Sequence, residues 1–197
     1  MNLRPEDGER IREPLEASDN PWVTLDSREI YRNAWITVRE DQVLRPDGQP
    51  GIYGVVETRV ATGVVALTPD QEIYLVGQYR YTMGEYSWEI IEGGTDTAEE
   101  LPLDAAKREL QEEAGLLAAH WEPLGHELHL TNCHSNERGH LFLATGLTEV
   151  ASSPDGTEEL QVKKVPLQEA VAMVERGEIK DAMSVMAILL ADRKLPR

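Results

Sequence analysis

Cysteine is nearly absent from this sequence. The 197 residues include one cysteine, Cys133. A single cysteine excludes an internal disulfide and is typical of a protein of the reducing cytosol. No basic cluster surrounds Cys133 in the sequence, so the local residues do not mark it as an activated nucleophile.

Long apolar runs and positive charge are also scarce. No stretch approaches the roughly 20 apolar residues of a membrane-spanning helix, and the first residues carry no apolar signal segment. Lys and Arg together number 19 against 36 Asp and Glu, giving a formal net charge of −17. This balance argues against general binding to nucleic acid or to anionic membranes. We expect a cytoplasmic protein with a mobile, polar N-terminal arm over residues 1–20.

The full chain has enough apolar content, 41%, for the core of one domain. Residues 22–59 are β-branched and partly alternating, with a turn composition at 45–51. Strand patterns continue at 62–68, 72–81, 86–91, 121–130, 138–147 and 160–167, and helical patterns lie at 102–114, 167–179 and 181–195. Many strands with few helices, not in regular βαβ alternation, predict an α/β fold with a mixed sheet between helical layers.

The helix predicted at 102–114 has clear ends and an unusual face. Pro102 suits its first turn, and Gly115 suits the position after its last residue. An apolar stripe is formed by Leu103, Ala106, Leu110, Ala114 and Leu117. Glu109, Glu112 and Glu113 crowd a side roughly 100° away, at spacings that cost roughly 0.2–0.5 kcal/mol for each like-charged pair. The face is either a solvated acidic surface or a site where Mg²⁺ or Mn²⁺ meets a pyrophosphate.

The segment 94–116 resembles the Nudix hydrolase signature, G-x5-E-x7-R-E-U-x-E-E-x-G-U with U aliphatic. All nine fixed positions match: Gly94, Glu100, Arg108, Glu109, Leu110, Glu112, Glu113, Gly115 and Leu116. The resemblance implies a Nudix α/β/α sandwich that acts on a nucleoside diphosphate linked to another group. It also implies that Glu109 and Glu113 are the main metal ligands, that Glu112 is an auxiliary one, and that Arg108 and Glu100 brace them.

The resemblance extends to the ADP-ribose and nucleotide-sugar pyrophosphatases. The stretch "QYRYTMGEYSWEIIEGG" is similar to the strand and loop before their signature, which implies that Arg80 contacts the diphosphate. The usual Pro-Ala is replaced by Ile91-Glu92, with one extra residue. Either Gly93 or Glu92 then supplies a backbone carbonyl to the metal, and Gly93 is preferred.

Residues 34–59 resemble the N-terminal β region of the same subfamily, which implies homodimerisation through residues 21–60 and a Nudix domain over 61–197. Trp35 and Tyr53 match aromatic positions that stack on the base; the alternative is a place in the sheet or the dimer core. Arg138, in the pattern "ER", is a further substrate contact. The segment "HLTNCHSNERGH" lacks the proline of ADP-ribose specialists, which favours a broader nucleotide-sugar hydrolase.

The function implied is Mg²⁺-dependent hydrolysis of a nucleoside diphosphate sugar to a nucleoside monophosphate and a sugar phosphate. Glu112 and Glu113 belong to its catalytic set, and Glu158, with Glu159 beside it, is the candidate general base. Three alternatives stay open. These are a nucleoside triphosphate or dinucleoside polyphosphate hydrolase, a non-catalytic Nudix ligand sensor, and an acidic adaptor without a ligand.

Overall fold

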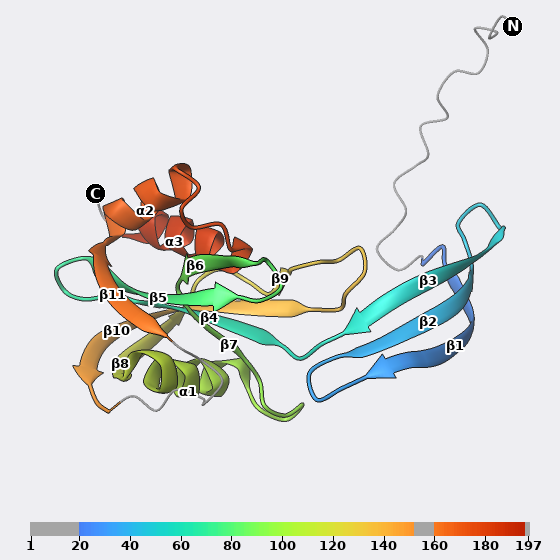
Figure 1. Cartoon of the computed structure of the whole chain (residues 1–197), viewed down its shortest axis with the longest axis horizontal. Coiled ribbons are helices and arrows are strands. Elements are labelled where there is room, and N and C mark those ends of the chain that lie inside the picture. Colours follow the sequence, from blue (N-terminus) through green and yellow to red (C-terminus); the bar gives the residue numbers. More distant parts are fainter. Residues whose placement is uncertain (1–19, 152–159, 196–197) are drawn as a thin grey trace, which may run out of the picture.

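An antiparallel three-stranded sheet precedes the main body of the protein. In the computed structural model, which describes residues 20–151 and 160–195, its order is β1-β2-β3. The strands are β1 (Val23–Arg32), β2 (Thr37–Leu44) and β3 (Pro50–Glu57). The predicted turn lies between β2 and β3, where Gly48 adopts a φ of 77°, a left-handed conformation that favours glycine. Figure 1 shows this sheet standing away from the rest of the chain.

The body holds two further sheets. The first is mixed and has the order β7-β4-β10-β8, with β9 paired to β10 and with β4 parallel to β10. Its strands are β4 (Ala61–Ala66), β7 (Ile91–Gly94), β8 (Leu116–Pro123), β9 (Leu128–His129) and β10 (Arg138–Glu149). The second sheet has the order β11-β5-β6 and is antiparallel. Its strands are β5 (Glu72–Arg80), β6 (Glu85–Glu89) and β11 (Gln161–Pro166).

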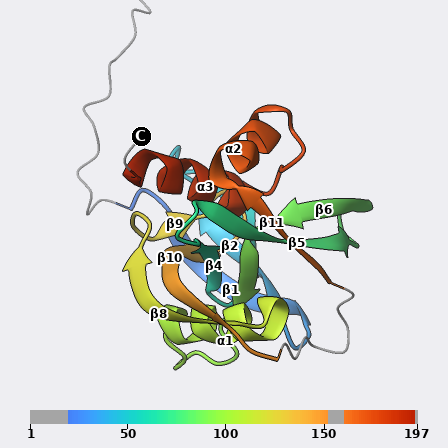
Figure 2. The same ribbon diagram turned by 90° about the vertical axis from the view of Figure 1, so that its left-hand side faces the viewer.

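Helices cover both faces of these two sheets, as Figure 2 shows. On one face, α1 (Pro102–Ala114) packs through Ala106 and Leu110 onto Val64, Val76 and Phe142. On the other face lie α2 (Leu167–Glu175) and α3 (Ala182–Lys194), over a second apolar cluster. The predicted α/β/α sandwich with a mixed sheet is therefore confirmed.

The prediction of one strand over 86–91 was wrong. The chain leaves β6 after Glu89 and enters β7 at Ile91, so that β6 pairs with β5 and β7 pairs with β4. Ile90 belongs to the apolar cluster under α2 and α3, whereas Ile91 belongs to the cluster under α1. Two neighbouring isoleucines thus serve two different cores at the point where the chain crosses between sheets.

Two smaller differences concern β8. The strand predicted over 121–130 is divided between the end of β8 and β9, because the chain turns at Gly125 with a φ of 86°. Leu117 is exposed in β8 and does not continue the apolar stripe of α1; Ala105 and Glu113 are buried on the helix instead.

The N-terminal sheet is connected to the body through β3. The N–H of Val56 donates to the carbonyl of His134 at 2.8 Å, and the N–H of Asn136 donates to the carbonyl of Val56 at 3.2 Å. The Tyr53 hydroxyl donates to the carbonyl of Cys133 at 2.8 Å. Within residues 20–151 and 160–195, none of the helices has the length and apolar character required to cross a membrane.

Candidate active site

Helix α1 carries the acidic face, and both of its ends are fixed by local signals. Pro102 begins the helix, where a missing N–H costs nothing. Gly115 ends it in a left-handed conformation, with φ 63° and ψ 41°, and its N–H donates to the carbonyls of Gln111 and Leu110. The predicted bounds of α1 are thereby confirmed. The two fixed ends set the position of its glutamates relative to the sheet.

Arg108 lies at the centre of the acidic face. Its Nη1 donates to Glu109 at 2.8 Å and to Glu112 at 3.0 Å, and its Nε contacts Glu100 at 3.3 Å. Its Nη2 donates to the carbonyl of Gly94 at 2.7 Å, which ties the helix to the end of β7. Burial lowers the pKa of Arg108, but the hydrogen bonds that Arg108 donates to these carboxylates, together with their negative charge, outweigh it and raise the pKa. One guanidinium therefore offsets the like-charge repulsion along this face.

Glu100 is anchored separately in the loop before α1. The backbone N–H of Asp96 donates to its carboxylate, and this bond lowers the pKa of Glu100, with Arg108 contributing further. Glu100 thus links the loop between β7 and α1 to the helix, since it accepts from Asp96 in the loop and from Arg108 on α1.

Strand β7 lies directly against two of the helix glutamates. The N–H of Glu92 donates to Glu113 Oε2 at 3.2 Å, and Glu113 is buried. Gly93 faces Glu109 so closely that a Cβ on Gly93 would lie 2.0 Å from the Glu109 carboxyl carbon. Only a residue without a side chain fits there. The structure therefore brings together six predicted residues: Gly93, Glu100, Arg108, Glu109, Glu112 and Glu113.

These carboxylates are distributed around Arg108 and β7. Within the described ranges, no three His, Cys, Asp or Glu side chains are gathered as metal ligands would be. The donor types still suit a hard divalent cation, since three carboxylates and a backbone carbonyl all offer oxygen. Because Gly93 has no side chain, the Glu109 carboxylate can lie next to the backbone of Gly93, whose carbonyl is the predicted metal ligand.

The side chain of Glu92 points away from α1, toward α3. The hydroxyl of Ser184 donates to Glu92 Oε1 at 2.6 Å and accepts the N–H of Ile90 at 3.0 Å. Burial raises the pKa of Glu92 well above its ordinary value, and the nearby Asp181 adds to this. Sequence reasoning missed Ser184; Asp181, which accepts the N–H of Ser184 as a helix cap, was the available signal.

Arg80 lies near the same group of acids. It is hydrogen-bonded to Glu89, with Arg80 Nε 3.0 Å from each carboxylate oxygen, and this contact raises the pKa of Arg80. Glu92 and Glu113 raise it further through their charge. Both partners line a cavity of about 640 Å³ that also includes Thr82, Thr131, Asp181 and Ala182. Glu89, the buried partner of Arg80, was not predicted from the sequence.

The other predicted residues lie elsewhere. Trp35 is 74% exposed in the connection between β1 and β2, and Tyr53 on β3 packs edge-on against Trp22. Arg138 lies at the start of β10, 3.5 Å from Glu127. Glu158 and Glu159 fall outside the described residues. The structure thus does not join these side chains to the acidic face of α1.

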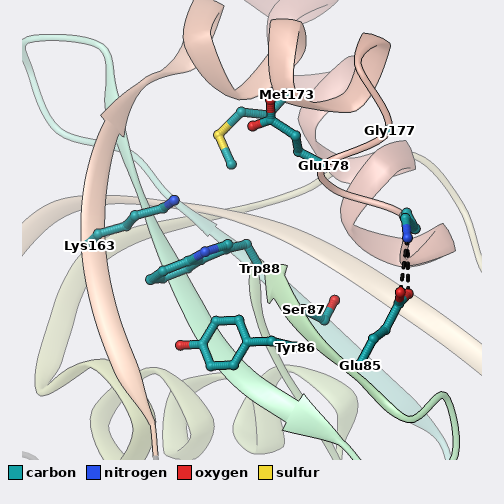
Figure 3. A pocket seen from close by; sticks show the side chains of 9 residues that line it. Glu85, Tyr86, Ser87, Trp88, Lys163, Met173, Gly177 and Glu178 are labelled. Atoms are coloured by element: carbon teal, nitrogen blue, oxygen red, sulfur yellow. Dashed lines mark hydrogen bonds and ion pairs between the residues drawn. The ribbon is translucent and has the colours of Figure 1, made fainter.

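A second pocket, of about 320 Å³, adjoins the Arg80 cavity and shares Glu85, Ser87 and Lys180 with it (Figure 3). The Nζ of Lys163 lies 3.7 Å from the centre of the Trp88 ring, and Tyr86 packs edge-on against that ring. Burial lowers the pKa of Lys163. Because Trp88 packs against the cluster under α2 and α3, this pocket is separated from the glutamates of α1 by the sheet.

Comparison with known proteins places two family models in succession along the chain. The nucleoside diphosphate sugar hydrolase N-terminal domain matches residues 22–56, and the NUDIX domain matches residues 57–187. An ADP-ribose pyrophosphatase of Mycobacterium tuberculosis is 35% identical over 174 residues, covering 87% of this chain and 84% of the relative. A methanol dehydrogenase activator of Bacillus methanolicus is 29% identical over 167 residues, covering 84% and 89% respectively.

A solved structure supports the fold. The crystal structure of an ADP compounds hydrolase superimposes with a TM-score of 0.78 at 23% identity and covers 87% of this chain and 92% of that chain.

Proposed function

Since the chain belongs to the NUDIX family of pyrophosphohydrolases, we propose that it hydrolyses the pyrophosphate bond of a nucleoside diphosphate sugar, ADP-ribose included. The products are a nucleoside monophosphate and a sugar phosphate. One observation carries the proposal: Glu109, Glu112 and Glu113 share one side of α1, and β7 meets them with a glycine and a backbone N–H. These oxygen ligands lie near Arg80, whose guanidinium can bind the oxygens of a diphosphate.

Mg²⁺, or Mn²⁺ in its place, is the cofactor of this proposal. Glu109, Glu113 and the carbonyl of Gly93 would hold it, with Glu112 as an auxiliary ligand. When bound there, such a cation would offset the negative charge of the diphosphate and would lower the pKa of a coordinated water. Arg108 and Glu100 hold the glutamate rotamers, because Arg108 bridges Glu109 to Glu112 and is itself held by Glu100.

The remaining roles are assigned to residues around this centre. Arg80 orients the diphosphate through its planar guanidinium, while Glu89 keeps that group in place. Glu158 takes the proton of the attacking water, with Glu112 and Glu113 keeping the water oriented. Trp35 and Tyr53 stack on the base, and Arg138 contacts the substrate. Because these three side chains make no contact with the glutamates of α1 among the described residues, we assign them to a site completed by the partner of a homodimer.

Two alternatives within the family are disfavoured by specific features. A nucleoside triphosphate or dinucleoside polyphosphate hydrolase would not require the N-terminal sheet that this chain carries at 22–56. A ligand sensor without activity would not require the complete glutamate set of α1. We further propose that the protein works in the cytoplasm, given its single cysteine.

The test is a substrate panel with Mg²⁺, in which phosphate is released from the products by a phosphatase. We expect turnover of ADP-ribose and of other nucleoside diphosphate sugars, and little turnover of nucleoside triphosphates. Glu113→Gln should reduce kcat by at least about a hundredfold while the protein stays folded, since it removes a ligand charge and keeps the side-chain size. Near-normal activity of Glu113→Gln would contradict the site, and preference for triphosphates would contradict the substrate class.

A further inference from the structure

One hydroxyl in the core of the body has no hydrogen-bond partner. Thr62 is fully buried in β4, and within the described ranges its Oγ1 is unpaired. A buried hydroxyl left without a partner destabilises the folded state, so a native structure retains one only for a reason. The residues that follow it on β4, Val64 and Val65, are apolar, and a valine at 62 would have nearly the same shape.

Thr62 faces α1. Its neighbour Gly63 lies against Ile90, Leu141 and Met183, on the face covered by α3. Side chains alternate along a strand, so Thr62 points to the other face, which it shares with Val64. That face is the one on which the glutamates of α1 lie.

The register of β4 and β7 places Thr62 directly opposite Gly93. Directly opposite positions of an antiparallel pair have Cβ atoms about 4.5–5.5 Å apart and form a contact pair. Gly93 has no side chain, and the Glu109 carboxyl carbon lies 2.0 Å from where its Cβ would be. The Glu109 carboxylate therefore occupies the position of the side chain that would neighbour Thr62.

We propose that Thr62 is a positioning residue for Glu109, donating a hydrogen bond from its hydroxyl to that carboxylate in the cation-loaded site. The inference rests on the proposed function, because it requires Glu109 to be a ligand. In the described structure Arg108 Nη1 holds Glu109 Oε1 at 2.8 Å. A second donor in addition to Arg108 would fix the rotamer of this carboxylate when a cation is bound, and Thr62 is the buried donor opposite Gly93. Partners of ligating side chains typically change metal affinity or activity about 10- to 100-fold when removed.

Two substitutions separate this role from packing. Thr62→Val removes the hydroxyl and keeps the shape, whereas Thr62→Ser keeps the hydroxyl and removes a methyl group. Mn²⁺ binding is measured by titration with paramagnetic resonance detection, and the melting temperature is measured without cation. We expect Thr62→Val to melt no lower than the unsubstituted protein and to bind Mn²⁺ about tenfold more weakly. Thr62→Ser should keep the Mn²⁺ affinity even if it melts somewhat lower.

The outcomes distinguish the role of Thr62 from the proposed function. Equal Mn²⁺ affinity in Thr62→Val and the unsubstituted protein would overturn the role of Thr62 and leave the proposed function intact. A lower melting temperature of Thr62→Val without cation would show that the hydroxyl already has a partner, which also overturns the inference. Failure of the unsubstituted protein to bind Mn²⁺ at all would overturn the proposed function together with it.

Discussion

At the scale of single residues, the arginines explain how an acidic cluster can exist on one side of a sandwich. Arg108 joins Glu109, Glu112 and Glu100, and Arg80 is paired with Glu89. Glu89 is 5% exposed and Arg80 is 36% exposed, so the pair holds a buried carboxylate under a guanidinium that water still reaches. Such an arginine can contact a ligand without giving up its structural partner.

Because Arg80 is paired with the buried Glu89, removing its side chain affects stability as well as substrate binding. Arg80→Ala would leave Glu89 as a buried, unpaired charge, at a cost of about 1–3 kcal/mol after allowing for solvent screening. Arg80→Lys keeps a positive charge beside Glu89 and loses the planar fork. We expect Arg80→Lys to raise KM for a nucleoside diphosphate sugar several-fold while the melting temperature changes little. Thermal melts and initial rates measure both; an unchanged KM in both variants would remove Arg80 from the substrate site.

At the scale of elements, the sequence predicts α1 well and the crossover between sheets poorly. Pro102, Gly115 and the apolar stripe are local signals, and helical spacing alone places Arg108 beside the glutamates. The break at Ile90 depends instead on pairing with β5 on one side and β4 on the other, which no local pattern encodes. The hydrogen bond between the Ile90 N–H and Ser184 is also beyond local patterns, because it joins residues 94 positions apart in the sequence.

Ser184 is predicted to stabilise this crossover. Ser184→Ala leaves the buried N–H of Ile90 without its acceptor and Glu92 without a donor, so the free energy of unfolding should fall by about 1–3 kcal/mol. Denaturant unfolding followed by circular dichroism measures the change. Ser135→Ala is the matched control, because Ser135 also accepts a backbone N–H, that of Glu137, at a partly exposed position where water can replace it. A loss in Ser184→Ala no larger than in the control would contradict this account.

At the scale of the whole molecule, the N-terminal sheet is too exposed to be explained by one chain. Every residue of β1 is exposed, and β1 is the outer strand of its sheet. Leu25 is 59% exposed and Ile30 is 51% exposed. Open strand edges and apolar patches of this kind are typical of surfaces that pair with another chain. Of the predicted substrate residues, Tyr53 lies on β3 of this sheet and Trp35 lies in the connection between β1 and β2.

We therefore expect a homodimer formed through β1–β3, measured as mass by light scattering after size-exclusion chromatography. The double substitution Leu25→Asp and Ile30→Asp should yield a monomer, because charges at both positions would be buried against the partner sheet. Leu189→Asp is the control, since Leu189 is 39% exposed on α3, away from this sheet, and should leave the mass unchanged. If the partner completes the substrate site, the monomer should also lose turnover while keeping its affinity for Mn²⁺. A monomeric unsubstituted protein with full turnover would contradict both the dimer and the shared site, and would return Trp35 and Tyr53 to purely structural roles.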